Sequence, residues 1–172
     1  GLTGELNLGE CTSLTSIGSD AFNGCSGLTG ELNLGECTSL TSIGNFAFSS
    51  CSGLTGELNL GGCTSLASIG YNAFAGCSGL TSISLPSSLT SIGWSAFDRC
   101  TNLTEVIIDS EYVYTNATST SACGDLFNNS SITTVKVWTS LLENGTNSYI
   151  TTNFTKGENE VIDGKSYTVY SK

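Results

Sequence analysis

The stretch GLTGELNLGECTSLTSIGSDAFNGCS, residues 1–26, is written three times in succession and a fourth time in shortened form. Residues 27–52 differ from it only at positions 45, 46, 49 and 50, and residues 53–78 only at 62, 67, 71, 72 and 75. Residues 79–101 keep the same frame with three residues fewer. Self-similarity at such a period is the signature of a repeat architecture, so we expect each unit to form one coil of a solenoid.

Apolar residues recur at the same places in every unit and predict a core shared by neighbouring coils. Leu6 and Leu8 are two residues apart, as one face of a strand requires, and the later units repeat this spacing. Glu5 and Asn7 alternate with these leucines and are therefore expected to point outward. Each coil is predicted to contribute one short parallel strand.

Two further features close each unit. An Ala-Phe pair, first seen at residues 21–22, places a large ring beside a small residue in the predicted interior. A glycine follows the last isoleucine of each unit and is predicted to turn the chain with a positive φ. These glycines are Gly18, Gly44, Gly70 and Gly93.

The pattern decays after Cys100. We assign residues 1–108 to repeats of 26, 26, 26 and 23 residues plus a partial coil, and residues 109–138 to a degenerate repeat with a polar loop inserted over 112–123. Residues 139–172 are assigned to a C-terminal cap. Two extended runs flank Asp163-Gly164 there, which predicts a β-hairpin over the end of the solenoid.

Residues 77–97 carry the pattern C-x-x-L-x-x-I-x-L-P-x-x-L-x-x-I-G-x-x-A-F. This pattern resembles the BspA-like, or Treponema pallidum-type, leucine-rich repeats. The resemblance implies a leucine-rich-repeat solenoid of short parallel strands, turns or short helical turns. Family members are mostly surface or secreted proteins, and several are adhesins, so the resemblance implies an extracellular or cell-surface location. The first three units depart from the usual form by three extra residues around Glu5 and Gly9–Cys11.

The charge balance excludes several partners. The net charge is −10, and none of the five Lys and Arg residues precedes Arg99, so no basic surface for nucleic acid is expected. No apolar run is long enough for a membrane-spanning helix. The chain contains no methionine, and Gly1 already lies inside a repeat, so we expect it to be a piece of a longer protein.

Eight cysteines raise the question of disulfides, buried thiols or a metal site. Stacked coils place successive cysteines roughly 5 Å apart, a separation compatible with disulfides. Cysteine is also among the most buried residue types, and we predict reduced, buried thiols. With no C-x-x-C and no histidine, neither a metal site nor a cofactor is predicted. The two ladders are Cys11, Cys37 and Cys63, and Cys25, Cys51, Cys77 and Cys100, with Cys123 apart.

Catalytic motifs are absent from the sequence. The lack of histidine excludes Ser-His-Asp and Cys-His arrangements. Glu31 and Glu57 on adjacent coils would have the roughly 5 Å separation of a retaining glycosidase pair, but a repeated ladder gives its carboxylates like environments, whereas that reaction needs unlike ones. No enzyme is therefore predicted. The acidic ladder of Glu5, Glu31 and Glu57 is either a solubilising face or a site for a cation or basic partner.

The most informative positions are those where near-identical units disagree. Residues 19–20 and 23–24 change from unit to unit. We therefore expect that packing requires no particular side chain there and that these positions are exposed along one edge. Exposed aromatic and charged side chains have the composition of a recognition patch. Neutral drift at unconstrained loop positions is the alternative. The candidate binding residues are Asp20, Phe46, Tyr71, Trp94, Asp98 and Arg99.

The sequence thus favours an adhesin-like protein-binding module with a protein or cell-surface ligand. The first alternative is a structural spacer or filament subunit whose coils stack end to end by self-association. The second is a glycan-active enzyme.

Overall fold

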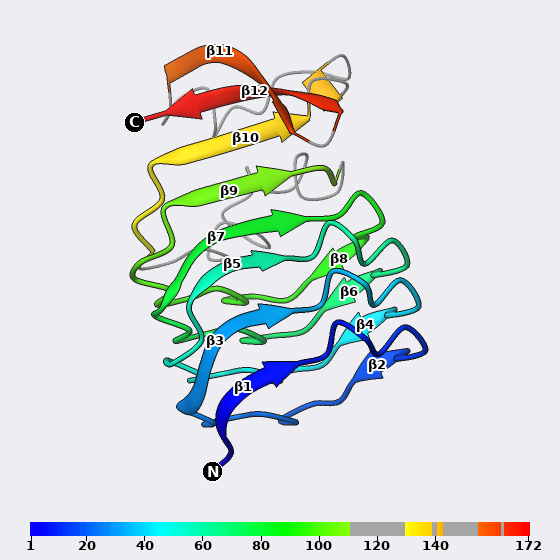
Figure 1. Cartoon of the computed structure of the whole chain (residues 1–172). Coiled ribbons are helices and arrows are strands. Elements are labelled where there is room, and N and C mark those ends of the chain that lie inside the picture. The colour runs from blue at the N-terminus through cyan, green and yellow to red at the C-terminus, as the bar shows by residue number, and fades with distance from the viewer. Residues whose placement is uncertain (111–129, 139–140, 143–154, 163) are drawn as a thin grey trace.

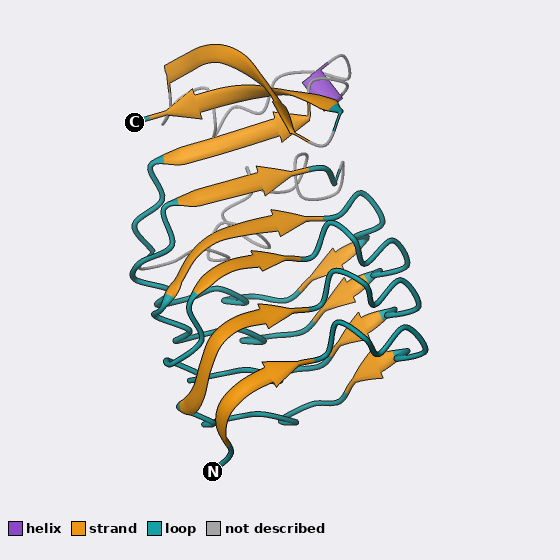
Figure 2. Cartoon of the chain, in the orientation of Figure 1, coloured by secondary structure: helices purple, strands orange, loops and turns teal. Residues whose placement is uncertain are grey.

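The computed structural model describes residues 1–110, 130–138, 141–142, 155–162 and 164–172. Successive coils stack into an elongated solenoid, and their strands line two different sides of the stack (Figure 1). Turns and loops join the strands in every coil (Figure 2). The predicted parallel β-solenoid is confirmed. The loop predicted over 112–123, as well as Cys123, lies outside the described residues.

Each coil begins with a first strand, which in the first four coils is the longer of two strands. These first strands are β1 (Thr3–Asn7), β3 (Gly27–Asn33), β5 (Gly56–Asn59), β7 (Leu80–Leu85), β9 (Glu105–Ile108) and β10 (Thr134–Trp138). The second strands have two residues each and form a parallel sheet in the order β2 (Ser16–Ile17), β4 (Ser42–Ile43), β6 (Ser68–Ile69) and β8 (Ser91–Ile92). The first strands lie along one side of the stack in two sheets, β1-β3 and β5-β7-β9-β10, which an isolated bridge from Gly30 to Leu54 connects. The second strands form a narrow sheet along another side.

The three extra residues of the first units have a visible structural role. One is a glycine in the first strand, and its positive φ accompanies a shift of strand register: Gly4 has φ 91° and Gly56 has φ 78°. The other two lengthen the turn after the strand, where the Asn7 side chain accepts a hydrogen bond from the Gly9 amide at 2.9 Å. The longer units therefore keep the same core as the shorter fourth unit.

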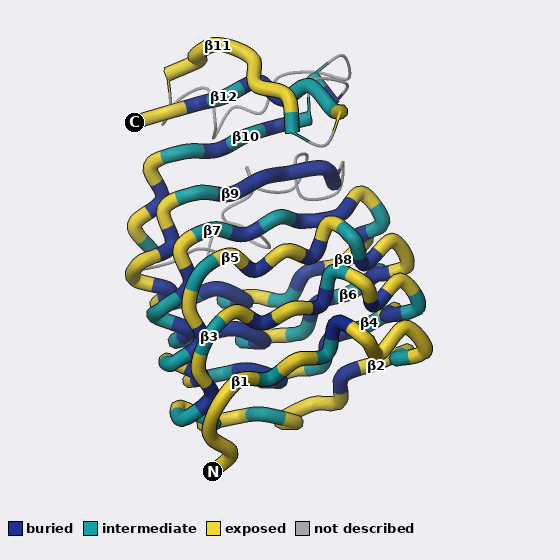
Figure 3. The backbone as a smooth tube through the Cα atoms, viewed as in Figure 1, coloured by how far each residue is buried: buried dark blue, intermediate teal, exposed yellow. Residues whose placement is uncertain are grey.

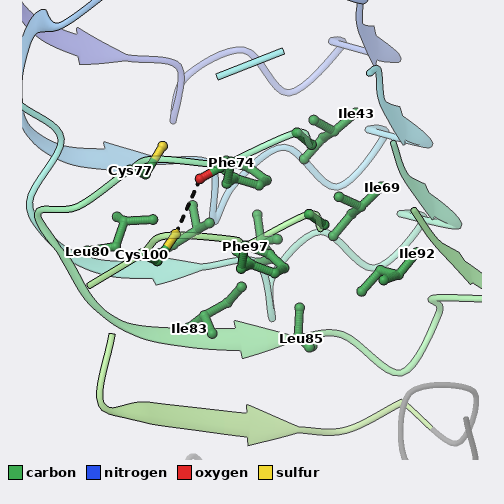
Figure 4. Packing of buried hydrophobic residues seen from close by; sticks show 14 of the residues in the cluster. Ile43, Ile69, Phe74, Cys77, Leu80, Ile83, Leu85, Ile92, Phe97 and Cys100 are labelled. Carbon is green, nitrogen blue, oxygen red and sulfur yellow. Dashed lines mark hydrogen bonds between the residues drawn. The ribbon is translucent and has the colours of Figure 1, made fainter. Parts of the chain in front are cut away.

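The core consists of the predicted apolar rows. The phenylalanine rings of the Ala-Phe pairs stack face to face along the solenoid, with centroids 5.0 to 5.3 Å apart and planes within 10° of parallel. Figure 4 shows Phe74 and Phe97 in this stack beside the isoleucines of the second strands. Buried residues recur at the same places in successive coils (Figure 3). Full burial of one such side chain contributes about 1.5–3 kcal/mol, and the stack adds this in every coil.

The glycines after the second strands have a different role from the predicted one. None of Gly18, Gly44, Gly70 and Gly93 has a positive φ, so the prediction of a left-handed turn at these residues is wrong. A Cβ atom at Gly44 would lie 2.5 Å from the backbone nitrogen of Ser19, and one at Gly70 would lie 2.5 Å from that of Asn45. The close approach of one coil to the preceding coil, rather than backbone conformation, therefore requires glycine.

Peptide groups in the turns after the second strands align along the solenoid. Three amides of each coil donate to three carbonyls of the next coil, as Phe48 donates to Ala73 at 2.7 Å and Phe74 to Ala96 at 2.8 Å. All nine bonds of this kind run from an earlier coil to a later one. Because the peptide dipoles of each column point the same way, they add as they do in a helix. This ladder fixes the turns regardless of their side chains.

The C-terminal strands extend the sheet and attach to it through charged side chains. β12 (Lys165–Ser171) pairs antiparallel with β10, and β11 (Thr155–Ile162) pairs antiparallel with β12, which forms the hairpin expected around Gly164. Asp109 is buried, and its carboxylate accepts hydrogen bonds from Lys165 Nζ at 2.5 Å and from the Tyr167 hydroxyl at 2.6 Å. Charged hydrogen bonds of this kind are the strong ones in proteins, so they fasten the hairpin to the segment that directly follows β9.

Candidate functional site

The variable residues lie in the turns that follow the second strands. We define the turn edge as residues 19–24, 45–50, 71–76 and 94–99. The turn edge contains all six candidate binding residues, Asp20, Phe46, Tyr71, Trp94, Asp98 and Arg99. The peptide ladder described above holds its backbone, so each coil presents its variable side chains at equivalent places.

The backbone conformation of the turn edge restricts its residue types more than the differences between units indicate. The second variable residue of each turn has a left-handed backbone, with φ of 59° at Asp20, 55° at Phe46 and 55° at Ser95. The fourth is also left-handed, with φ of 61° at Ser50 and 56° at Arg99. Glycine, Asn and Asp adopt this conformation most readily. The expectation that packing leaves these positions unconstrained is therefore incomplete, because the backbone disfavours most residue types at two of the four.

Two aromatic side chains project from the turn edge. Tyr71 is 45% exposed and Trp94 is 57% exposed. Phe46 is half-buried, and its ring meets that of Tyr71 edge-on, with centroids 5.2 Å apart and an interplanar angle of 79°. The side chain of Asn45 accepts a hydrogen bond from the Tyr71 amide at 2.9 Å. Coil two thus supports the aromatic residue that coil three presents.

A groove of about 460 Å³ runs beside these aromatics over the sheet of second strands. Its floor is formed by the serines of β4, β6 and β8 and the glycines that follow these strands, and one wall by Ser19, Asn45 and Tyr71, the first variable residues of the first three turns. Trp94, the equivalent residue of the fourth turn, is not part of the lining. No feature of the sequence indicates the groove, because the floor serines are ordinary repeat residues and only the pairing of the second strands brings them side by side. The lining residues are Ser19, Ser42, Ile43, Gly44, Asn45, Ser68, Ile69, Gly70, Tyr71, Ser91 and Gly93.

The charged candidates lie apart from the groove lining. Asp20 accepts a hydrogen bond from the Asn23 side chain at 2.8 Å, within its own turn. Arg99 pairs with its neighbour Asp98 at 3.6 Å, and its side chain is 76% exposed. The Asp98 side chain is only 20% exposed, but a contact of this length to so exposed a guanidinium contributes little to stability. The structure therefore brings Phe46 and Tyr71 into contact, whereas Asp98 and Arg99 occupy the far end of the turn from Trp94.

The acidic ladder lies on the first strands, away from the groove. Glu5, Glu31 and Glu57 are exposed, as predicted. Glu5 and Glu31 line a separate hollow of about 360 Å³ together with Leu6, Asn7 and Asn33, and Glu57 is not part of it. Among the described residues no three His, Cys, Asp or Glu side chains gather in a way that could hold a metal ion. The exposure of all three carboxylates matches a solvated face.

The cysteine ladders form a regular hydrogen-bonding pattern. Each of five buried thiols donates to a carbonyl of the preceding coil, as Cys63 does to Leu34 at 3.1 Å and Cys77 to Phe48 at 3.1 Å. The same pattern holds for Cys37, Cys51 and Cys100, and Figure 4 shows the bond from Cys100 to Phe74. The seven described cysteines are free thiols. The prediction of burial is wrong for Cys11, which is exposed, and for Cys25, which is half-buried, because both lie on coil one with no earlier coil to cover them.

Burial also changes the acidity of these thiols. It raises the pKa of Cys51 and of Cys63 to about 11 and that of Cys100 to about 12. The pKa of Cys77 is raised well above its ordinary value for the same reason. Since the thiolate is the nucleophile, these thiols are poor reactants at neutral pH and act as structural hydrogen-bond donors.

The repeat type is settled by comparison with known families. The BspA-type leucine-rich-repeat region matches residues 5–123 in six copies. The chain belongs to the BspA-type leucine-rich-repeat family. Membership indicates a protein-interaction module, and repeat proteins of this kind are typically non-catalytic scaffolds. No curated protein matches the chain.

Two solved structures of leucine-rich-repeat proteins are similar to part of the chain. A Treponema pallidum leucine-rich-repeat protein shares 27% identity over 55% of this chain and 52% of its own, with a TM-score of 0.40. A leucine-rich-repeat protein of Bacteroides ovatus shares 28% identity over 62% of this chain and 37% of its own, with a TM-score of 0.29. The match therefore spans about half of the T. pallidum protein. Within the described part of the chain, no helix is long and apolar enough to cross a membrane.

Proposed function

We propose that this chain is an adhesin-like module of a cell-surface or secreted protein and that it binds its ligand along the turn edge. The observation that carries the proposal is the exposure of Tyr71 and Trp94 at equivalent places in adjacent coils, with the Tyr71 ring supported by Phe46. Aromatic residues of this kind dominate the energy of binding interfaces. Because the peptide ladder fixes the turns, little conformational entropy is lost when they meet a ligand.

The test replaces three side chains by residues that the same chain carries at equivalent positions. Tyr71→Ser copies Ser19, Trp94→Asn copies Asn45, and Arg99→Gly copies Gly76. The fold should tolerate these residues, so binding to immobilised collagen, fibronectin and laminin and to epithelial cells can be compared directly with the unmodified chain. Binding of the unmodified chain and its loss in the triple variant are expected. Equal binding by both proteins would contradict the proposal.

No specific observation favours the two alternatives. End-to-end stacking requires a coil face at each end, but the described C-terminal end continues into the antiparallel strands β12 and β11. Light scattering over a range of concentrations separates a stable monomer from a growing assembly. For the glycan-active enzyme, the exposed glutamates offer no pair of carboxylates in unlike environments.

A further inference from the structure

We propose that the groove beside the turn edge binds a neutral oligosaccharide, with Tyr71 and Trp94 as the stacking surface and the floor serines as hydrogen-bonding partners. This inference rests on the proposed function and names the chemistry of its ligand. Three observations carry it: a row of free hydroxyl groups on the groove floor, the exposed rings of Tyr71 in the lining and of Trp94 at the equivalent position of the next coil, and a lining without charge.

The floor of the groove presents a regular row of hydroxyl groups. Ser42, Ser68 and Ser91 occupy the same register in β4, β6 and β8, and strands in a sheet lie about 4.8 Å apart. In the described structure, no protein group hydrogen-bonds these three hydroxyls. The adjacent threonines differ, because Thr41 Oγ1 donates to the Thr15 carbonyl at 2.8 Å and Thr90 Oγ1 to that of Ala67 at 3.2 Å. The serine hydroxyls are therefore available to a ligand as both donors and acceptors.

The floor between the serines is low because glycines follow the second strands. Gly44, Gly70 and Gly93 all line the groove, and close contact with the preceding coil leaves no room for a side chain at Gly44 or Gly70. A ligand can therefore approach the serine row and the backbone directly. The same steric requirement that stacks the coils keeps the groove open.

The aromatic rings supply the apolar half of the site. Tyr71 lines the groove, and Trp94 occupies the equivalent position one coil later. A sugar ring has hydroxyl groups at its rim and C–H groups on its faces, so it can stack on an aromatic ring while its rim bonds to serines. Tyr71 is held by the edge-on contact with Phe46 and by the bond from its amide to Asn45, and it is therefore oriented before a ligand arrives.

The absence of charge decides the class of ligand. The lining residues of the groove are Ser, Gly, Ile, Asn and Tyr, and none of them is ionised at neutral pH. A charged peptide segment or an acidic polysaccharide would lose hydration here without gaining an ion pair. The chain is also strongly acidic overall, which repels anionic ligands. A neutral, extended oligosaccharide satisfies the hydroxyls, the rings and the lack of charge together.

The experiment measures binding of cellohexaose, chitohexaose and mannohexaose by isothermal titration calorimetry, with a heparin hexasaccharide as the anionic comparison. At least one neutral hexasaccharide is expected to bind, and heparin is not. Tyr71→Ser and Trp94→Asn should each weaken that binding about tenfold, as loss of a stacking ring does. Ser68→Ala should weaken it less, and Glu36→Gln, a change outside the groove lining, should leave it unchanged. Circular dichroism of each variant checks that the fold is retained.

Two outcomes would overturn the inference. One is a failure of all three neutral hexasaccharides to bind, and the other is binding that Tyr71→Ser and Trp94→Asn leave unchanged. Periodate oxidation of the cell-surface ligand separates this inference from the proposed function. If the chain still binds oxidised cells, and this binding is lost in the triple variant, the turn edge recognises protein and only the oligosaccharide inference fails.

Discussion

Replacing Gly70 by alanine should destabilise the solenoid, whereas the same replacement at Gly18 should not. The two glycines follow the same Ser-Ile dipeptide in their units, and neither has a positive φ. They differ in their surroundings. A Cβ atom at Gly70 would lie 2.5 Å from the Asn45 nitrogen and 2.6 Å from the Gly44 carbonyl carbon, and one at Gly18 would have no neighbour within 4 Å. Only at Gly70 must backbone move to admit a methyl group.

The size of the effect follows from this geometry. Overpacking of a tightly packed site costs about 1–3 kcal/mol, and here the crowding atoms belong to the backbone. Removing glycine from a position that alanine tolerates stabilises by about 0.4–1 kcal/mol, through the unfolded chain. The two variants should therefore differ by about 2–3 kcal/mol in the free energy of unfolding, which corresponds to several degrees in Tm for a chain of this length.

Thermal unfolding followed by circular dichroism is the direct assay, and urea unfolding gives the free-energy difference. Gly44→Ala serves as a second test, because its Cβ would lie 2.5 Å from the Ser19 nitrogen. Equal destabilisation by Gly18→Ala and Gly70→Ala would refute the reasoning. It would mean that turn conformation, common to both sites, rather than coil contact demands glycine.

Four other perturbations have defined outcomes. Ser50→Gly should raise the free energy of unfolding by about 0.5–1 kcal/mol in urea titrations, because Ser50 has a φ of 61° and the equivalent residues of coils one and three are glycine. Iodoacetamide at neutral pH should modify Cys11 and Cys25 before the five buried thiols, as peptide mass mapping would show. Burial raises the pKa of all five thiols above 9.0 in the folded state, so their contribution to stability is complete below pH 9 and should be lost as the pH rises through the raised pKa values. These are about 11 for Cys51 and Cys63 and about 12 for Cys100, and melting curves at increasing pH would detect the loss. Asp109→Asn removes the ion pair with Lys165 and should cost about 1–2 kcal/mol, with faster amide hydrogen exchange in β12.

Most of the fold is predictable from the sequence because the core repeats. Leu6 and Leu8 occupy the same register in every coil, so one reading of the period-two pattern locates the first strand in all of them. The second strands are harder, since two residues are too few to show a period. The recurrence of Ser-Ile-Gly marks their positions. That these residues form strands becomes clear only from the pairing of neighbouring coils.

The glycine rows show why sequence alone misassigned a role. A recurring glycine indicates either a left-handed backbone or a close approach between two segments of backbone. Both causes produce the same sequence pattern, a glycine at one position of every unit. Gly70 is there for close approach, whereas the left-handed residue is Asn72, two positions later. The amide ladder between coils, which makes both necessary, involves no side chain and therefore has no sequence signature.

Only the aromatic part of the candidate site could be predicted from the sequence, for a related reason. Differences between units pointed to Tyr71 and Trp94, but nothing in them indicated that the neighbouring serines form the floor of one groove. Recognition of the floor needed the spacing of strands, which is set by backbone hydrogen bonds. The residues that differ between units therefore indicate where the wall of the groove lies. The floor is formed by residues that are the same in every unit, so comparison of the units does not reveal it.

The backbone of the turn edge adds an argument about which variable residues reflect function. Among the second variable residues, Asp20 and Asn72 are types that adopt a left-handed backbone readily, whereas Phe46 is a bulky residue for which it is unfavourable. Strain that persists in a structure motivates a functional hypothesis where a compensating role is visible. At Phe46 that role is the edge-on contact that orients Tyr71. Neutral drift at this position would favour residues such as the Asp and Asn of coils one and three, so the phenylalanine is better explained by its contact with the Tyr71 ring, which supports the proposal that this surface binds a ligand.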